Sequence, residues 1–235
     1  MTTVAVSLFR RLWPVYAVFA ALLVTVVAVV GTLIGTYGSL TDSAWNIGAA
    51  STTKWLVGSI GFILLPSYLR QYVANGVTRR EFLGGGLLFG IGSAAGFALL
   101  VLAGFGVERL IYGATGLMDG LTEPYPVHSA GSAVAVLVRA FLIYLAHICT
   151  AWLVAVGFYR YGALTGLLLI PPSLVPAFGS ELFFGTEWSP VGGVDLLGLD
   201  LPFAASALLT AVLVVAGCAI VHQLGRAVAI RGKIT

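Results

Sequence analysis

Residues 15–36 read VYAVFAALLVTVVAVVGTLIGT, an uncharged and almost wholly apolar run of 22 residues. A helix needs about 20 such residues to cross the hydrocarbon core of a bilayer. The run is also longer than the apolar core of a signal peptide, which has about 7–15 residues. It therefore predicts a first transmembrane helix rather than a cleaved leader.

The whole chain has the composition of a membrane protein. Of its 235 residues, 59% are hydrophobic and 9% are charged, with a mean hydropathy of +1.03. Soluble domains carry about 25% charged residues. A soluble fold of this length could not hide so much apolar surface. We therefore expect one all-α integral membrane domain over residues 1–235, without a separate soluble domain.

Further apolar segments predict six spans in total. Residues 1–13 are expected to form an interfacial helix, which Pro14 separates from the first span. The fifth span meets Pro171 and Pro172 after about nine residues. We therefore expect a broken helix, followed by an extracytoplasmic re-entrant segment over residues 172–202. The other spans are predicted at residues 55–72, 82–107, 133–158 and 203–224.

The basic residues predict the orientation, because cytoplasmic loops carry an excess of Lys and Arg. Nine of them fall on one side of the predicted spans and three on the other. The nine are Arg10, Arg11, Arg70, Arg79, Arg80, Arg160, Arg226, Arg231 and Lys233, and the three are Lys54, Arg109 and Arg139. Together with the excess of Arg over Lys, this predicts a bacterial plasma-membrane protein with both termini in the cytoplasm.

Small residues predict close helix packing in the third span. Gly86 and Gly90 form one pair at four-residue spacing, and Gly92 and Gly96 form another. Such pairs let helix backbones approach each other. They are compatible with packing inside the chain or with a dimer interface.

Motifs for nucleotide, metal or acyl chemistry are missing from the sequence. It contains no GxxxxGK[ST] loop, no HExxH helix, no Cys/His set with zinc spacing and no GxSxG elbow. We therefore expect no enzyme activity, no cofactor, no metal site and no nucleic-acid partner for this chain.

Polar residues inside the fourth span are candidates for a substrate pathway. His147 has Tyr144 one turn before it and Thr150 one turn after it. An ionisable side chain at this depth faces a cavity or the protein interior by default. Either substrate contact or a neutral hydrogen bond between helices would explain His147. Arg139, higher in the same span, is predicted to pair with Glu181 beside the broken fifth span.

The connection between the second and third spans, residues 67–82, has the strongest local signals. Asn75 and Gly76 are typical of the end of a helix. Thr78 and Glu81, three residues apart, predict a capping box at the start of the next helix. Two helices are thus expected to meet in a rigid corner. Three arginines decorate it, namely Arg70, Arg79 and Arg80.

The segment NGVTRREF, residues 75–82, resembles the loop between the second and third spans of type 2 ABC exporter permeases. The expected six spans, interfacial N-terminal helix and re-entrant segment resemble that family as well. The resemblance implies that the loop is a coupling helix, which docks onto an ATPase subunit. Asn75 and Gly76 would then shape the corner, Thr78 and Glu81 would cap the third span, and Arg70, Arg79 and Arg80 would face the ATPase.

The resemblance also implies the partners. Two permease chains, identical or homologous, would enclose a pathway in the lipid membrane, and two separate ATPase subunits would bind ATP and Mg²⁺. Transport would proceed by alternating access, with a hydrophobic or amphipathic substrate.

Three other interpretations remain open from the sequence. The arginines of the corner could only orient the chain or contact anionic lipid headgroups. The chain could be the substrate-binding membrane subunit of a vitamin importer. It could also be an intramembrane enzyme, which would need His147 within reach of a carboxylate and a nucleophile.

Overall fold

A computed structural model describes residues 1–37, 42–122, 124–185 and 201–226, and these residues form helices joined by short turns, with no strand among them. The helices are α1 (Thr2–Tyr37), the π-helical turn η1 (Asn46–Ala50), α2 (Ser51–Ala74), α3 (Arg79–Thr115), the 3-10 turn η2 (Leu117–Gly120), α4 (Ala130–Tyr161), α5 (Ala163–Leu168), α6 (Ile170–Ser173), α7 (Val175–Phe184) and α8 (Phe203–Arg226).

Within these residues, five helices are long and apolar enough to cross a bilayer, namely α1, α2 continued from η1, α3, α4 and α8. This confirms an all-α membrane protein. The helices extend beyond the predicted spans by a few residues at most ends, because polar terminal turns continue the helix outside the apolar window.

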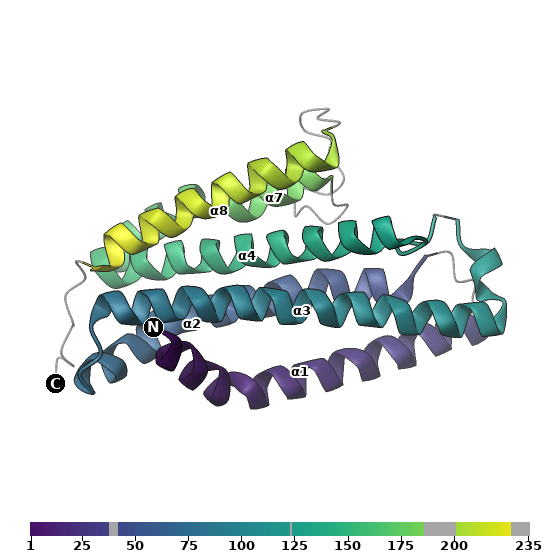
Figure 1. Ribbon diagram of the computed structural model, residues 1–235, viewed down its shortest axis with the longest axis horizontal. Coiled ribbons are helices and arrows are strands. Elements are labelled where there is room, and N and C mark those ends of the chain that lie inside the picture. The colour runs from purple at the N-terminus through teal and green to yellow at the C-terminus, as the bar shows by residue number, and fades with distance from the viewer. Residues whose placement is uncertain (38–41, 123, 186–200, 227–235) are drawn as a thin grey trace.

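The bundle is organised around α4, which packs against α2, α3, α7 and α8. Figure 1 shows α4 between the α2 and α3 pair on one side and the α7 and α8 pair on the other. In contrast, α1 packs mainly against α3. The interior of the described bundle therefore lies along α4, and α1 lies at its edge.

The predicted separation of residues 1–13 from the first span is wrong. Pro14 lies inside α1, which continues without interruption from Thr2 to Tyr37. A proline in a helix removes one backbone hydrogen bond and bends the axis, and Figure 1 shows a change of direction near the N-terminal end of α1. The first turns stay helical because Val4 and Leu8 are buried, with Val4 against Gly85 of α3.

The predicted interruption of the fifth span is present. The chain forms three short helices here, with Leu169 and Leu174 between them. Proline is tolerated in the first turn of a helix, where its missing N–H would have no partner, and α6 and α7 each have one at their second residue. None of the three reaches span length alone, so the sixth span remains a prediction. Much of the predicted re-entrant segment, residues 186–200, lies outside the described residues.

The glycines of the first predicted pair serve packing inside the chain. A Cβ atom at Gly86 would meet the ring of Trp152 in α4, and one at Gly90 would meet the side chain of Ile148. The second pair behaves differently: Gly92 lies against Phe9 of α1, whereas Gly96 faces open space.

Basic side chains gather at one end of the bundle. The N-terminus and the turn between α2 and α3 lie at this end (Figure 1). Arg11 Nη1 of α1 donates to Gln71 Oε1 of α2 at 2.8 Å, and Arg160 Nη1 of α4 donates to the Leu224 carbonyl of α8 at 2.9 Å. The described members of the predicted basic side therefore share one end of the structure.

Candidate functional site

A buried ion pair joins α2 to α7 inside the bundle. Lys54 Nζ lies 2.6 Å from Glu181 Oε1, and the two side chains are 5% and 3% exposed. Lys54 sits in the first turn of α2, and Glu181 lies in α7 beyond the proline-rich interruption. Lys54, which the charge count places on or toward the outer side, is thus buried between helices.

Glu181 therefore has Lys54 as its basic partner, rather than the predicted Arg139. Arg139 is half-buried, two turns before His147 in α4. Position along the spans does not show which side chains meet across helices, so the sequence could not identify this pair. Which face of α2 points inward depends on its packing against α4.

His147 lies beside the ion pair. Its Nε2 is 3.7 Å from Glu181 Oε1, and its Nδ1 is 2.8 Å from the Ile143 carbonyl oxygen. A carbonyl only accepts hydrogen bonds, so Nδ1 carries a hydrogen and donates it. Nε2 is then the nitrogen that would take up a proton, and it faces the carboxylate. Trp55 covers the imidazole edge to face, with ring centroids 5.7 Å apart.

These three ionisable groups, Lys54, His147 and Glu181, are here called the charged cluster. His147 lies 17 residues from the start of α4 and 14 from its end, hence roughly 25 Å and 21 Å from the two ends at 1.5 Å per residue. His147 thus lies near the middle of α4, far from both ends of the helix. Taking charges out of water costs several kcal/mol per ion, so intramembrane charges of this kind generally have a function.

The other predicted pathway residues surround the charged cluster. Tyr144 is 2% exposed and Thr150 7% exposed. Thr150 Oγ1 accepts a hydrogen bond of 3.0 Å from the Ala177 N–H of α7. This bond satisfies a backbone donor in the first turn of α7, where the helical ladder is interrupted. The structure therefore brings His147 and Thr150 to the α4–α7 contact, and Tyr144 is buried one turn before His147 on α4.

The described residues do not assemble an enzymatic dyad around His147. Its Nε2 is too far from Glu181 for a hydrogen bond, and its Nδ1 is engaged by a backbone carbonyl. In addition, the described chain contains no group of three His, Cys, Asp or Glu side chains that could hold a metal ion. What the cluster can do chemically is to hold three helices together, to exchange a proton or to bind a polar group.

The second candidate region is the predicted corner between α2 and α3, residues 67–82, and this name is kept for it. The Gly76 N–H donates to the Val73 carbonyl at 3.0 Å and the Val77 N–H donates to the Tyr72 carbonyl at 3.0 Å. These two bonds form a Schellman motif. Gly76 has a φ of +84°, a left-handed conformation that favours glycine. The predicted end of the helix is confirmed.

The predicted capping box at the start of α3 is also confirmed. Thr78 Oγ1 accepts from the Glu81 N–H at 3.2 Å, and the Thr78 N–H donates to Glu81 Oε2 at 2.9 Å. Arg70 and Arg80 are exposed, and Arg79 is half-buried. The corner therefore presents cationic side chains on a backbone that is fixed on both sides.

The corner is also braced by α1. Tyr72 donates its hydroxyl hydrogen to Ser7 Oγ at 2.8 Å and packs against Phe82, with ring centroids 5.4 Å apart. The Arg11 guanidinium lies 5.7 Å from the centre of the Tyr68 ring. A displacement of the corner would consequently move α1, α2 and α3 together.

Helix α2 links the corner to the charged cluster. Lys54 and Ala74 are 20 residues apart in this uninterrupted helix, or roughly 30 Å at 1.5 Å per residue. Pro66 lies inside α2, where it provides a point of bending. The two candidate regions therefore occupy opposite ends of one helix.

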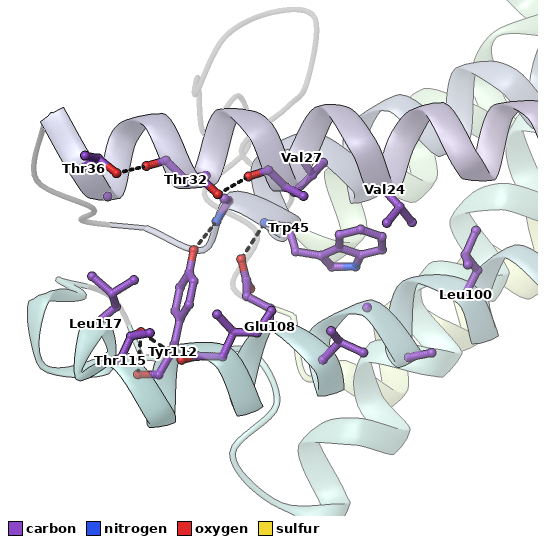
Figure 2. Close-up of a pocket in the computed structure, with 18 residues that line it drawn as sticks. Val24, Val27, Thr32, Thr36, Trp45, Leu100, Glu108, Tyr112, Thr115 and Leu117 are labelled. Carbon is purple, nitrogen blue, oxygen red and sulfur yellow. Dashed lines mark hydrogen bonds between the residues drawn. The ribbon is translucent and has the colours of Figure 1, made fainter.

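A third polar group, missed from the sequence, surrounds Glu108 near the far end of α3. Ser43 Oγ and the Tyr125 hydroxyl donate to its Oε2 at 2.5 and 2.9 Å, and the Trp45 N–H donates to its Oε1 at 2.8 Å. Figure 2 shows Glu108 reaching toward the Trp45 backbone. Burial raises the pKa of Tyr125, and the nearby Glu108 charge raises it further. The only sequence signal was a carboxylate in an apolar helix, whose donors lie far away in the chain.

Compared with known proteins, the chain matches no family model, no curated protein and no solved structure. A functional conclusion therefore has to come from the corner, the charged cluster and the helices that join them.

Proposed function

We propose that this chain is the permease subunit of an ABC transporter, an exporter that moves a hydrophobic or amphipathic substrate across the bacterial cell membrane. Two permease chains, identical or homologous, would enclose the pathway. Two separate ATPase subunits would bind ATP and Mg²⁺ on the cytoplasmic side, at the end that carries the corner. The observation that carries the proposal is the corner itself.

The corner has the properties that a coupling element requires. It is exposed, cationic and capped on both sides, so a force applied to it moves whole helices instead of deforming a loop. Arginines are also well suited to contacts with carboxylates on a partner protein. A loop that served only to orient the chain would need the arginines, but it would not need the two caps.

The charged cluster supports the same proposal from the other end of α2. A transporter needs an element with two arrangements, whose balance the partner can shift. Lys54 and Glu181 are held by different helices, α2 and α7. A displacement of α2 at the corner would therefore stretch or break the contact between Lys54 and Glu181. In this way, movement of the corner by the ATPase would reach the interior of the membrane domain.

The first test is to purify the chain in mild detergent from its own cells and to identify associated proteins by mass spectrometry. An ABC ATPase should co-purify in equal amounts. A ligand-induced rise in the melting temperature of the isolated chain with a vitamin, in the absence of an ATPase partner, would instead favour the importer interpretation.

The second test measures coupling in the reconstituted complex. The double substitution Arg79→Glu, Arg80→Glu should abolish substrate-stimulated ATP hydrolysis and transport while the melting temperature of the membrane subunit stays unchanged. Arg226→Glu is the matched control, because Arg226 is an exposed arginine at the same end of the bundle but outside the corner. Full transport by the double variant would refute the proposed role of the corner.

A further inference from the structure

An elongated cavity separates the second half of α1 from α3. Its volume is about 670 Å³, within the range of pockets that bind small molecules. The helices α1 and α3 form its walls, and residues 44 and 45 contribute to its lining. Figure 2 shows the indole ring of Trp45 between the two helices, with Val24 and Val27 on the α1 side. We call this cavity the slot.

The shape of the slot follows from the spacing of its lining residues. Those of α1 include Val24, Val27, Ala28 and Gly31, which recur every three or four residues and therefore lie on one face of the helix. The lining residues of α3 follow the same spacing from Leu100 onward. Two such facing stripes line a space that runs along the helices for roughly 18 Å on the α1 side, from Val24 to Thr36, at 1.5 Å per residue.

The width of the slot is limited by Trp45. The Trp45 indole donates to the Val101 carbonyl of α3 at 2.9 Å and is 6% exposed, and a Cβ atom at Gly104 would overlap its ring. On the other side, a Cβ atom at Gly48 would meet the Val27 side chain of α1. The segment that carries Trp45 thus touches both walls. Trp45 therefore fills part of the space between the two helices.

The slot has one polar end. Glu108, Tyr112 and Thr36 lie among its lining residues where α1 approaches its last turn, and Figure 2 shows them on the same side of the pocket. Thr32 and Thr115 also line the slot near this end, and the remaining lining residues are apolar or, like Trp45, aromatic. The arrangement matches an amphiphile, with its polar part at the helix ends and a hydrocarbon chain along the helices.

The lipid bilayer around the helices determines which molecule can fill the slot. The hydrocarbon core of a bilayer offers no water, and an apolar cavity remains dry and accepts apolar molecules. Leaving it empty would forfeit the dispersion contacts of both walls. We propose that the slot is a binding site for one hydrocarbon chain of a membrane phospholipid. This inference does not depend on the proposed transport function.

The experiment uses the fluorescence of Trp45 as the reporter. A single-tryptophan chain is made by replacing Trp13, Trp55, Trp152 and Trp188 with Phe, and it is purified in detergent micelles. Phosphatidylcholine with a brominated acyl chain is then titrated in, because bromine quenches indole fluorescence on contact. Saturable quenching of Trp45 is expected. Quenching that rises linearly without saturation would overturn the proposal.

Two variants fill the slot, and one serves as control. Gly31→Leu combined with Ala103→Leu, or Ala28→Leu alone, should raise the half-saturating lipid concentration about tenfold, which corresponds to about 1.4 kcal/mol. Gly106→Leu adds the same side chain to α3 where a Cβ atom meets open space, and it should leave the titration unchanged. The same half-saturating lipid concentration in all variants would overturn the proposed binding site. A second result would also overturn it. If a dimer isolated from the same micelles shows no quenching of Trp45, the slot is an interface between two copies of the chain.

Discussion

The helices α1 and α4 are similar in length and apolar composition, yet they lie in different surroundings. They are 36 and 32 residues long, and both are apolar enough to span a bilayer. Of the most apolar stretch of 18 residues, however, 6% is buried in α1 and 44% in α4. Hydropathy therefore identifies a helix that can cross the membrane, but not its neighbours, because lipid tails are as apolar as leucine.

The polar residues in the second half of α1 and in α4 reflect the difference. The hydroxyls of Thr25 and Thr32 donate to carbonyls four residues earlier in α1 itself. In α4, by contrast, Thr150 accepts from the backbone of α7, and His147 faces Glu181. A polar side chain that is satisfied within its own helix tolerates lipid, whereas one that needs a partner on another helix draws that helix to it.

The largest expected effect comes from the charged cluster. Lys54→Met alone should destabilise the protein by about 3–5 kcal/mol, because it leaves the Glu181 carboxylate buried without this partner charge. The double variant Lys54→Met, Glu181→Leu should recover most of that loss. Unfolding of the purified chain in mixed micelles measures both. If the losses of stability in Lys54→Met and Glu181→Leu simply add in the double variant, the pair does not act as a unit.

A smaller effect is expected where α3 meets α4. Gly86→Leu should destabilise the bundle by about 1–3 kcal/mol, since the new side chain would collide with Trp152. Gly106→Leu on the same helix has free space and should leave stability unchanged. The comparison uses the same unfolding assay, and equal effects at the two positions would contradict the packing described for Gly86.

Removing the cap of α3 should destabilise the protein only near the corner. Thr78→Ala removes the capping box of α3 and should cost about 1 kcal/mol. Hydrogen exchange should accelerate in the first turn of α3 but not in the middle of α4. Thr115→Ala, in the last turn of the same helix, is the control substitution. Uniform acceleration throughout the bundle would mean that the cap stabilises the whole fold rather than the corner.

The smallest effect is expected on the lipid-facing side of α1. Val26→Ala should change stability by less than about 0.5 kcal/mol, as surface substitutions generally do, because Val26 is exposed. Val156→Ala, at a fully buried position of α4, should cost about 1–2 kcal/mol by leaving a cavity. Reversal of this order in the unfolding assay would contradict the assignment of α4 to the interior.

Local signals in the sequence determined the helices and the corner. Long apolar runs predict spanning helices, and the bonds formed by Gly76, Thr78 and Glu81 involve residues within a few positions of each other. For that reason these features could be read directly from the chain. The continuation of α1 through Pro14 could not, since helicity before the proline is stabilised by packing against α3.

Only the tertiary structure decided how the polar residues combine. Lys54 and Glu181 are 127 positions apart, and Glu108 binds donors on both sides of it in the chain. The pairings depend on how each helix is rotated about its axis and on how far the interrupted helices α5 to α7 carry Glu181 along α4. Neither quantity has a local signature, because both are set by side chains that meet across helices.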